Sequence, residues 1–332
     1  MALYGGRFRA ALLALGMLIG APAAGCSAQP GTVTAAGAAA PMFPAAEWLN
    51  TPIARNPKIA PNSATWVGYF AESGAQRVAN LHDYATTLVH SSAITGSTPR
   101  YDVTFTKAWG PDPFGGHTVP IPAGTLCPPG DDGALAIHDP VTGQVFGLWQ
   151  ARYDKAADRW TASWGGMVPA GGSGVDRSGS ATGTNISRFA GVVTAAQFTA
   201  AREANAGLDH ALVFSSDISG PGFVGPATKS DGVNAARVAV PIPEGYRVQL
   251  DPAVNVDALP GITAGEKVIA KTLQTHGAYV IDTGGARMAF SFEALPGATS
   301  SSPGRAYTAA GFDWDYFDMT AIPWSKLRVL AP

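Results

Sequence analysis

Short alternations of apolar and polar residues, bounded by turn residues, recur along most of the chain. The runs hold five to eight residues and are rich in aromatic and β-branched side chains, which is typical of half-buried strands. We expect strands at Thr65–Phe70, Tyr101–Thr106, Ala134–His138, Val145–Arg152, Arg159–Trp164, Asp209–Ser215, Tyr246–Leu250, Ala278–Asp282 and Arg287–Phe292. Residues 139–143 and 154–158 have the composition of the two turns of a three-stranded meander, and Thr283-Gly284-Gly285 that of a hairpin turn.

Two segments carry the end signals of α-helices instead. Thr194-x-x-Gln197 and Thr263-x-x-Glu266 have capping-box spacing, and Gly207 and Gly277 follow them as C-terminal glycines. Many short strands with two short helices predict a mainly β protein, built as an antiparallel β-sandwich or jelly roll.

The N-terminal residues have the pattern of an export signal. Arg7 and Arg9 precede the apolar run Ala10–Ile19, and small residues then lead to Cys26. The run is about half of the ~20 residues that a membrane-spanning helix requires, so we expect a signal peptide at 1–25. The small residues before Cys26 resemble the bacterial lipobox, with Ala23 where leucine is more common. Lipidation of Cys26 is therefore expected; the alternative is an ordinary secretory signal with an incidental cysteine.

The segment after Cys26 is rich in Ala, Gly, Ser and Thr and has no periodicity. We expect a lipidated cysteine and flexible tether at 26–41 and a single β-sandwich domain at 42–332. The predicted location is extracytoplasmic, with the protein lipid-anchored to the cell membrane, or secreted if Cys26 is not modified.

Composition narrows the class of protein. The chain has 332 residues with 40 Gly, 26 Pro and a net charge of −2, which favours a loop-rich β protein. Removing Arg7 and Arg9 with the signal leaves 20 basic against 24 acidic residues, so no nucleic-acid partner is expected. Cys127 has no partner cysteine once Cys26 is lipidated and no basic neighbour in sequence, so we expect a buried, unreactive thiol.

The sequence has no familiar catalytic motif in the secondary-structure context that the motif requires. Gly220–Gly225 satisfies G-x-G-x-x-G, but it follows no βαβ pattern and Pro226 comes next. The six histidines lack the spacing of zinc ligands. We expect no metal site and no cofactor, and ATP or nicotinamide dependence does not fit an extracytoplasmic protein.

Histidine and aspartate residues at the ends of predicted strands are the remaining candidates for acid–base chemistry. The predicted catalytic set is His138, Asp139, His210 and Asp231, with Asp282 at a strand end as a further acid. Two such groups on adjacent strands could serve as general base and acid, with burial separating their pKa values.

Each candidate also has a structural interpretation. Asp139-Pro140 and Asp231-Gly232 are ordinary turn sequences, and His210 precedes an apolar run that would make it a core histidine.

Tryptophans are the second clue to a ligand. Trp149, Trp160 and Trp164 lie in the predicted meander, where exposed indoles suit stacking on sugar rings; the alternative is that they fill the core. We predict that Trp149, Trp164, Arg152 and Lys229 bind substrate, and Arg152 or Arg188 could neutralise a substrate carboxylate.

The segment from Phe312 to Asp318 alternates aromatic and acidic residues. We expect its aromatics to pack on the domain and its acids to face water. Binding of sugar or of a structural Ca²⁺ through Asp313, Asp315 and Asp318 is the alternative.

Several short motifs together resemble a family of secreted bacterial proteins, frequent in actinobacteria. They span residues 100 to 292 and include Val119-Pro120-Ile121-Pro122, His138-Asp139-Pro140, Trp164-Gly165-Gly166-Met167, Asp209-His210-Ala211-Leu212, Ala227-Thr228-Lys229-Ser230-Asp231-Gly232 and Pro243-Glu244-Gly245-Tyr246-Arg247. The family is uncharacterised, and the resemblance implies an association with carbohydrate-active β-sandwich proteins. It implies no particular reaction.

The sequence therefore supports two hypotheses. The first is a surface-attached enzyme, a glycoside hydrolase or polysaccharide lyase, that cleaves cell-wall or environmental polysaccharide by acid–base catalysis. The second is a non-catalytic envelope lipoprotein that binds glycan or another partner. Both predict a polysaccharide ligand, a membrane contact through the lipid and a monomeric protein.

Overall fold

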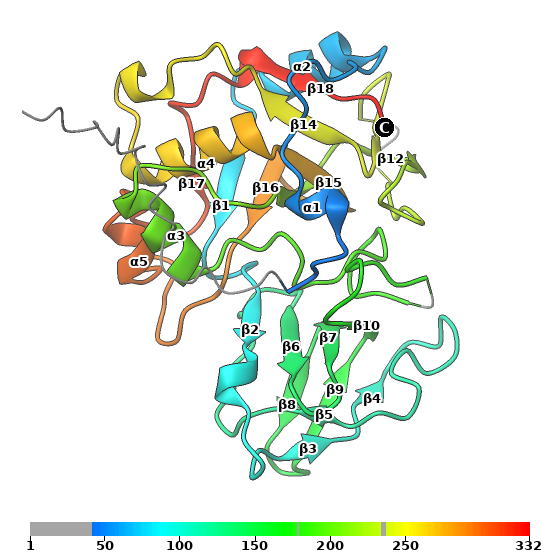
Figure 1. Ribbon diagram of the computed structural model, residues 1–332. Helices are drawn as coiled ribbons and strands as arrows, with labels where there is room; N and C mark the ends of the chain where they lie inside the picture. The colour runs from blue at the N-terminus through cyan, green and yellow to red at the C-terminus, as the bar shows by residue number, and fades with distance from the viewer. Residues whose placement is uncertain (1–41, 178, 234–236) are drawn as a thin grey trace, which may run out of the picture. The chain divides into compact units, whose positions relative to one another are not determined.

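A mixed seven-stranded sheet is the largest element of the computed structural model, which describes residues 42–177, 179–233 and 237–332 (Figure 1). Its strand order is β17-β1-β16-β11-β15-β14-β18. The strands are β1 (Arg77–Asn80), β11 (Leu212–Ser216), β14 (Arg247–Leu250), β15 (Ala278–Thr283), β16 (Met288–Ser291), β17 (Phe317–Asp318) and β18 (Leu327–Val329). The β1–β16 and β11–β15 pairs are parallel, and the other pairs are antiparallel.

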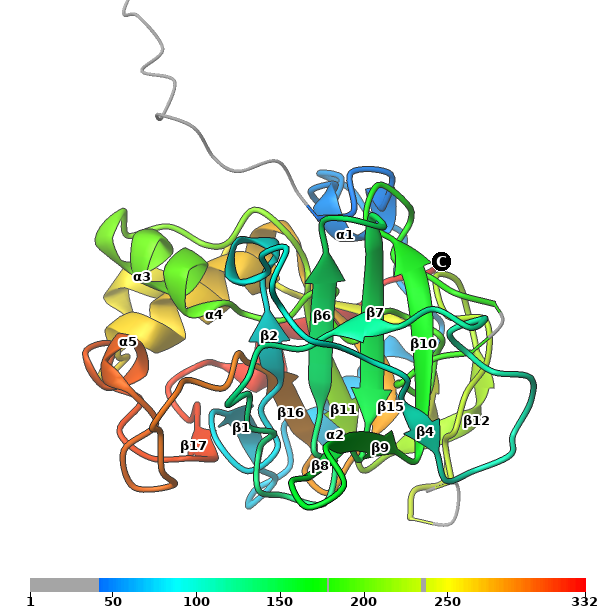
Figure 2. The ribbon, with the colours of Figure 1, turned by 90° about the horizontal axis from the view of Figure 1, so that it is seen from below.

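A second sheet has the order β10-β7-β6-β2, and Figure 2 shows its four strands side by side. They are β2 (Thr87–Val89), β6 (Leu135–Asp139), β7 (Gln144–Trp149) and β10 (Trp164–Pro169). Three small sheets pair β3 (Arg100–Tyr101) with β5 (Val119–Pro120), β12 (Ser219–Phe223) with β13 (Ile242–Glu244), and β4 (Thr104–Phe105) and β8 (Arg152–Asp154) with β9 (Arg159–Ala162).

Helices connect the strands. In the described residues the α-helices are α1 (Glu47–Asn50), α2 (Ser63–Phe70), α3 (Ala195–Glu203), α4 (Ala264–Thr275) and α5 (Arg305–Thr308). Short 3₁₀ turns occupy Ser91–Ala93, Val256–Ala258 and Trp324–Lys326.

The central strands of both sheets are buried on both faces. Along β15, Ala278 and Val280 pack with helices α2 to α5, while Tyr279 and Ile281 point to a second core shared with β6 and β7. Along β6, Ala136 joins this shared core, and Leu135 and Ile137 point to a third core on the far face. Because successive side chains of a strand point to opposite faces, each of these strands packs into two cores and so joins the layers.

Both predicted helices begin at their sequence signals, but α3 ends at Glu203 with Ala204 as its C-cap, so Gly207 is not its C-terminal glycine. Thr263 and Glu266 form a reciprocal capping box at α4, and Gly277 follows that helix with a φ of +67°. At α3, Thr194 Oγ1 accepts a hydrogen bond from the Gln197 backbone N–H. Both helices are confirmed.

The β-rich class is confirmed, but several finer predictions are wrong. Parallel pairs rule out a wholly antiparallel fold. Thr65–Phe70 belongs to helix α2, because Ser63, Trp66 and Phe70 bury one helical face. Residues 283–285 do not close a hairpin, since β11 lies between β15 and β16. The sandwich or jelly-roll arrangement stays a prediction.

The predicted signal peptide, Cys26 and the tether lie outside the described residues. The described part belongs to one compact unit, Ala40–Pro332. Within it, no helix has both the length and the apolar character needed to cross a bilayer.

Candidate functional site

A pocket of about 220 Å³ brings aromatic, acidic and basic side chains together. Strands β7 and β10 contribute to one side of it, and the end of β15 contributes to another, together with the loops at 180–188 and 229–231. The volume is below the ~300–1,000 Å³ of pockets for drug-sized ligands, so it suits a single ring or one residue of a longer chain. A larger groove of about 520 Å³ next to Pro332 has no acidic residue in its lining.

Three tryptophans form the aromatic wall of the pocket. Trp149 on β7 and Trp164 on β10 are cross-strand partners. Trp109 stacks on Trp149 with ring centroids 5.8 Å apart, lies 5.9 Å from Trp164, and is 63% exposed. A hydrogen bond holds Trp149 in place, because its Nε1 donates to Asp132 Oδ1 at 2.9 Å. The wall therefore offers an indole face that a ligand can reach.

Two carboxyl groups, those of Asp231 and Asp282, line the same pocket. Asp231 lies in an exposed loop, and its Oδ1 accepts hydrogen bonds from the Thr283 backbone N–H at 3.1 Å and from Thr283 Oγ1 at 3.0 Å. Asp282 precedes this threonine on β15, and its Oδ2 lies 3.4 Å from Arg188 Nη2. A sheet strand thus positions both acids.

The backbone at Gly183 shows how close the two acids are. A Cβ added there would lie 2.4 Å from Asp231 Oδ1 and 3.1 Å from Asp282 Oδ1, so these oxygens are no more than 5.5 Å apart. Glycine is the residue that this close approach permits.

The pKa values of the two acids are shifted in opposite directions. Burial raises the pKa of Asp282 well above its usual value, and the nearby Arg188 only partly opposes this effect. For Asp231, partial burial would raise the pKa, but hydrogen bonds outweigh it and the pKa lies below the usual value. These bonds come from Glu244, Asp282 and Thr283. Burial thus favours the protonated form of Asp282, and hydrogen bonding favours the ionised form of Asp231.

Two cations line the same pocket. Arg188 donates to the backbone carbonyl of Ala181 as well as pairing with Asp282, and its Nε is buried without a hydrogen-bond partner in the described structure. Lys229 precedes the acidic loop position and is exposed. Of the predicted substrate-binding residues, Trp149, Trp164 and Lys229 thus meet at one pocket.

Arg152, the fourth predicted substrate-binding residue, is engaged elsewhere. Its guanidinium donates to the backbone carbonyls of Ala151 and Gly130, at 2.8 and 3.2 Å. It does not line the pocket as the described residues define it, and it braces the loop that carries Asp132.

His138 and Asp139 lie at the opposite end of the four-stranded sheet. They pair with Val145 and Gln144, four and five residues before Trp149, which is roughly 14–17 Å at ~3.4 Å per residue. Asp139 is fully buried and Arg100 Nη2 lies 2.7 Å from its Oδ2. Asp139 also accepts bonds from the residues of its own turn, so its structural interpretation is supported.

The two predicted histidines are not brought to Asp231. Burial lowers the pKa of His138, with Asp139 opposing this effect. His210 is buried with its Nδ1 at 2.9 Å from the Ala211 carbonyl oxygen, and burial lowers its pKa as well. Neither lines the pocket among the described residues, and His210 is placed as a core histidine would be.

Two other predictions concern Trp160 and Cys127. Trp160 is buried in the core on the far face of β6, on a different strand from Trp164. Trp160 therefore fits the alternative in which the tryptophan fills the core. Cys127 is half-buried, and burial raises the pKa of its thiol to about 12, as expected for an unreactive cysteine.

Sequence reasoning missed Trp109 and Glu244. Trp109 follows Ala108 and precedes a Gly-Pro turn. An indole in a turn has no strand to pack on, and this feature of the sequence could have identified it. Glu244 ends β13, and the local sequence Pro-Glu-Gly gives no sign that it is fully buried.

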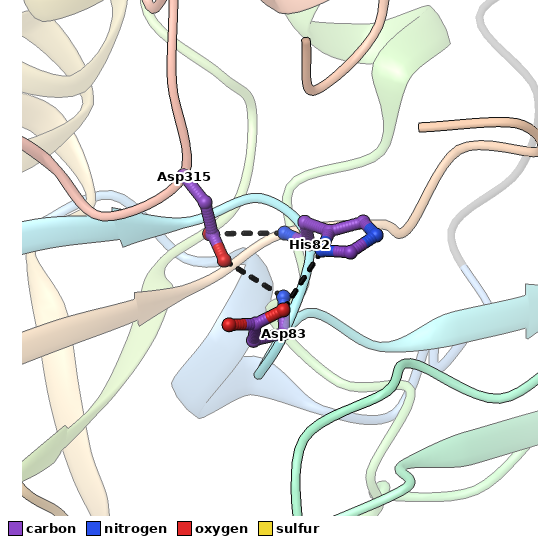
Figure 3. Close-up of side chains that lie close together, drawn as sticks. All are labelled: His82, Asp83 and Asp315. Carbon is purple, nitrogen blue, oxygen red and sulfur yellow. Dashed lines mark hydrogen bonds and ion pairs between the residues drawn. The ribbon is translucent and has the colours of Figure 1, made fainter. Parts of the chain in front are cut away.

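The ligand atoms of His82, Asp83 and Asp315 lie within 4.8 Å of one another, which makes them the metal-ligand candidate of the described residues (Figure 3). The oxygens of Asp315 already accept bonds from the backbone N–H groups of residues 81, 82, 83 and 316. His82 Nδ1 and Asp83 Oδ1 lie 2.8 Å apart. Since these groups satisfy each other, the cluster is a poor fit for a cation.

The same geometry bears on the acidic tail. Asp315 is fully buried, and Asp318 accepts a hydrogen bond from the Arg77 backbone N–H at 3.0 Å. The expectation that these acids face water is wrong for Asp315, because the chain uses it to hold residues 81–83. The expected packing of the aromatics is confirmed for Phe312, which is buried and stacks on Phe317.

Searches of protein families, of curated proteins and of solved structures find no match to this chain. The family resemblance drawn from the sequence motifs stays a prediction.

Proposed function

We propose that the protein is a carbohydrate-active enzyme that hydrolyses a glycosidic bond at the tryptophan-lined pocket. The observation that carries this proposal is the pair Asp231 and Asp282, two neighbouring acids with pKa values shifted in opposite directions. Such a split assigns acid and base roles to chemically identical groups. The tryptophan wall of the same pocket supports a sugar ring as the ligand.

In this mechanism Asp282 is the general acid. Burial favours its protonated form, in which it would share its proton with Asp231 through a hydrogen bond. A bound glycosidic oxygen would take this proton in place of Asp231 as the bond to the leaving group breaks.

Asp231 is then the ionised partner that faces the developing positive charge at the sugar carbon. The Oδ1 atoms of the two acids are no more than 5.5 Å apart and a hydrogen bond joins the groups, which leaves no room for the water that fits between the ~6.5–9.5 Å acids of inverting enzymes. We therefore propose direct attack by Asp231 and a glycosyl intermediate that water later hydrolyses, with overall retention of configuration.

A lyase is the weaker variant of this proposal. Arg188 is paired with Asp282 at 3.4 Å, so the lining residue left to neutralise a substrate carboxylate is the exposed Lys229. The proposal rests on a β-rich fold with several sheets. The sandwich or jelly-roll arrangement of these sheets is itself part of the proposal.

We also propose that the enzyme works outside the cytoplasm, attached through Cys26, on cell-wall or environmental polysaccharide. The charged and apolar pattern of residues 7–26 supports this location.

The test is a screen of the purified protein against polysaccharides that include arabinogalactan and acidic glycans. Reducing-end assays detect hydrolysis, and absorbance detects the unsaturated products of a lyase. We expect hydrolysis by the wild type and a loss of about 10²–10⁴-fold in kcat for Asp231→Asn and Asp282→Asn.

Asp102→Asn is the matched control, because this acid is exposed and lies outside the pocket. Equal losses in all three variants would contradict the assigned roles. Retention of one glycan without any product would identify a binding protein instead.

A further inference from the structure

Glu244 is an enclosed carboxyl group that the mechanism above does not use. It ends β13 and has no solvent-exposed surface. No hydrogen-bond donor of the described residues is in bonding geometry with its Oε1 or Oε2. An ionised carboxylate in such a place would lack both water and donors, which strongly disfavours the charged form.

The side chains around Glu244 leave it one effective partner. Ser230 is adjacent, but its hydroxyl donates to the Gly220 carbonyl at 2.8 Å and accepts from the Gly232 N–H at 2.9 Å. The remaining neighbour within hydrogen-bonding reach is the carboxyl group of Asp231. Two carboxyl groups can hydrogen-bond only when one of them carries a proton.

The location of that proton follows from the surroundings of each group. Asp231 is exposed to solvent and accepts two hydrogen bonds from Thr283, both of which favour its ionised form. Glu244 has neither solvent exposure nor a hydrogen-bond donor among the described residues to favour its ionised form. The proton therefore belongs on Glu244.

We propose that Glu244 is a positioning residue that stays protonated at neutral pH and donates its O–H hydrogen bond to Asp231. This bond holds the Asp231 carboxylate in place from behind while its other face remains open to the pocket. The importance of this bond for catalysis rests on the proposed function; the protonation of Glu244 does not.

The charges around the pair agree with this assignment. Burial raises the pKa of Glu244 to about 9, and the negative charge of Asp231 acts in the same direction. Asp282 would raise it further in its ionised form, and Arg188 is paired with Asp282. The other charged groups of the pocket are Lys229 and Asp132. With Glu244 and Asp282 neutral, the charges of Asp231 and Arg188 balance.

Carbon-13 NMR of the full chain labelled at glutamate Cδ tests the protonation directly. The sequence contains six glutamates, so six signals are expected. One signal should keep the shift of a protonated acid at pH 7, change only near pH 9, and disappear in Glu244→Gln. If all six signals complete their titration below pH 6, the proposal is wrong.

Activity on the polysaccharide found in the screen tests the positioning role. Glu244→Gln keeps an N–H donor and should leave the acid limb of the kcat/KM profile in place. Glu244→Ala removes the donor, so the pKa of Asp231 should rise and the acid limb should move to higher pH, with about a tenfold loss at its midpoint.

A merely structural role would lower activity without moving the limb, and an unmoved limb in folded Glu244→Ala would overturn the positioning role. If Glu244→Ala does not fold, a displaced limb in Glu244→Gln overturns it instead. Complete inactivity of the wild type on every glycan would refute the proposed function, and the NMR titration would still decide the state of Glu244.

Discussion

Asp139 and Glu244 are equally buried carboxyl groups in opposite states. Neither has any exposed surface, and burial by itself raises the pKa of both. Around Asp139, hydrogen bonds from Arg100, Val141 and Thr142 outweigh burial, and its pKa lies below the usual value. Around Glu244 the described residues provide no such donors, and its pKa rises to about 9.

The difference teaches that donors, and not burial, decide the charge of an enclosed acid in this protein. Asp139 sits at a turn, where free backbone N–H groups and a nearby arginine supply donors. Glu244 sits at a strand end against a loop that uses its own donors elsewhere. The hydrogen bonds around Asp139 fix the backbone of its turn, whereas Glu244 keeps its proton next to the pocket.

The largest expected effect comes from removing Arg100, the charged partner of Asp139. Arg100→Ala leaves Asp139 buried without its charged partner, and we expect a loss of about 3 kcal/mol in the free energy of unfolding. Urea denaturation measures it. The control is Arg159→Ala, whose exposed pair with Asp154 spans 3.7 Å and should contribute less than about 1 kcal/mol. Similar losses in both variants would show that Asp139 does not depend on Arg100.

The pH dependence of stability should differ in sign at the two acids. Asp139 has a lowered pKa, so the advantage of wild type over Asp139→Asn should hold at neutral pH and shrink as the pH falls below about 4. Glu244 has a raised pKa, so wild type should lose stability relative to Glu244→Gln between about pH 4.5 and 9.

For Glu244, the difference in free energy of unfolding can change by at most about 1.4 kcal/mol per pH unit. Urea denaturation of the three proteins from pH 3 to pH 8 measures both slopes. Slopes of the same sign would contradict the difference between the two sites.

The smallest expected effect concerns the aromatic side of the pocket. Trp109→Ala removes an exposed indole that stacks on Trp149, and the loss of about 1 kcal/mol of ligand stacking should raise KM about fivefold with kcat little changed. Trp314→Ala is the control, since this tryptophan is also exposed and lies outside the pocket. A fall in kcat with constant KM would place Trp109 in the chemistry instead of in binding.

Local signals in the sequence predicted the strands and helices better than their pairing. The capping box at Thr263 and the strand Leu135–Asp139 depend on neighbouring residues, and both are found. The order β16-β11-β15 depends on contacts between segments about 70 residues apart, which no local pattern encodes. Hence the hairpin expected at residues 283–285 was wrong.

The same limit explains the candidate site. Asp231, Trp149 and Trp164 were predicted from residue type and turn chemistry, and the pocket contains them. His138 and Asp139 have the same local appearance, but periodicity does not say which end of the β6–β7 pair meets the acidic loop. Glu244 was missed because its neighbours Ser230 and Asp231 belong to a separate loop, which no local pattern around Glu244 shows.

The strand order of the seven-stranded sheet has a consequence for how the protein is made. Its two edges are β17 and β18, which follow every other strand of that sheet in the sequence. A chain synthesised from the N-terminus therefore exposes β1 and β14 as unpaired edges until residues 317–329 emerge, and open edges invite pairing with other chains. Asp315, in the same late segment, also fixes residues 81–83 only then. The sheet is thus complete only after all of its other strands have been made, and until then its open edges favour pairing between copies of the chain.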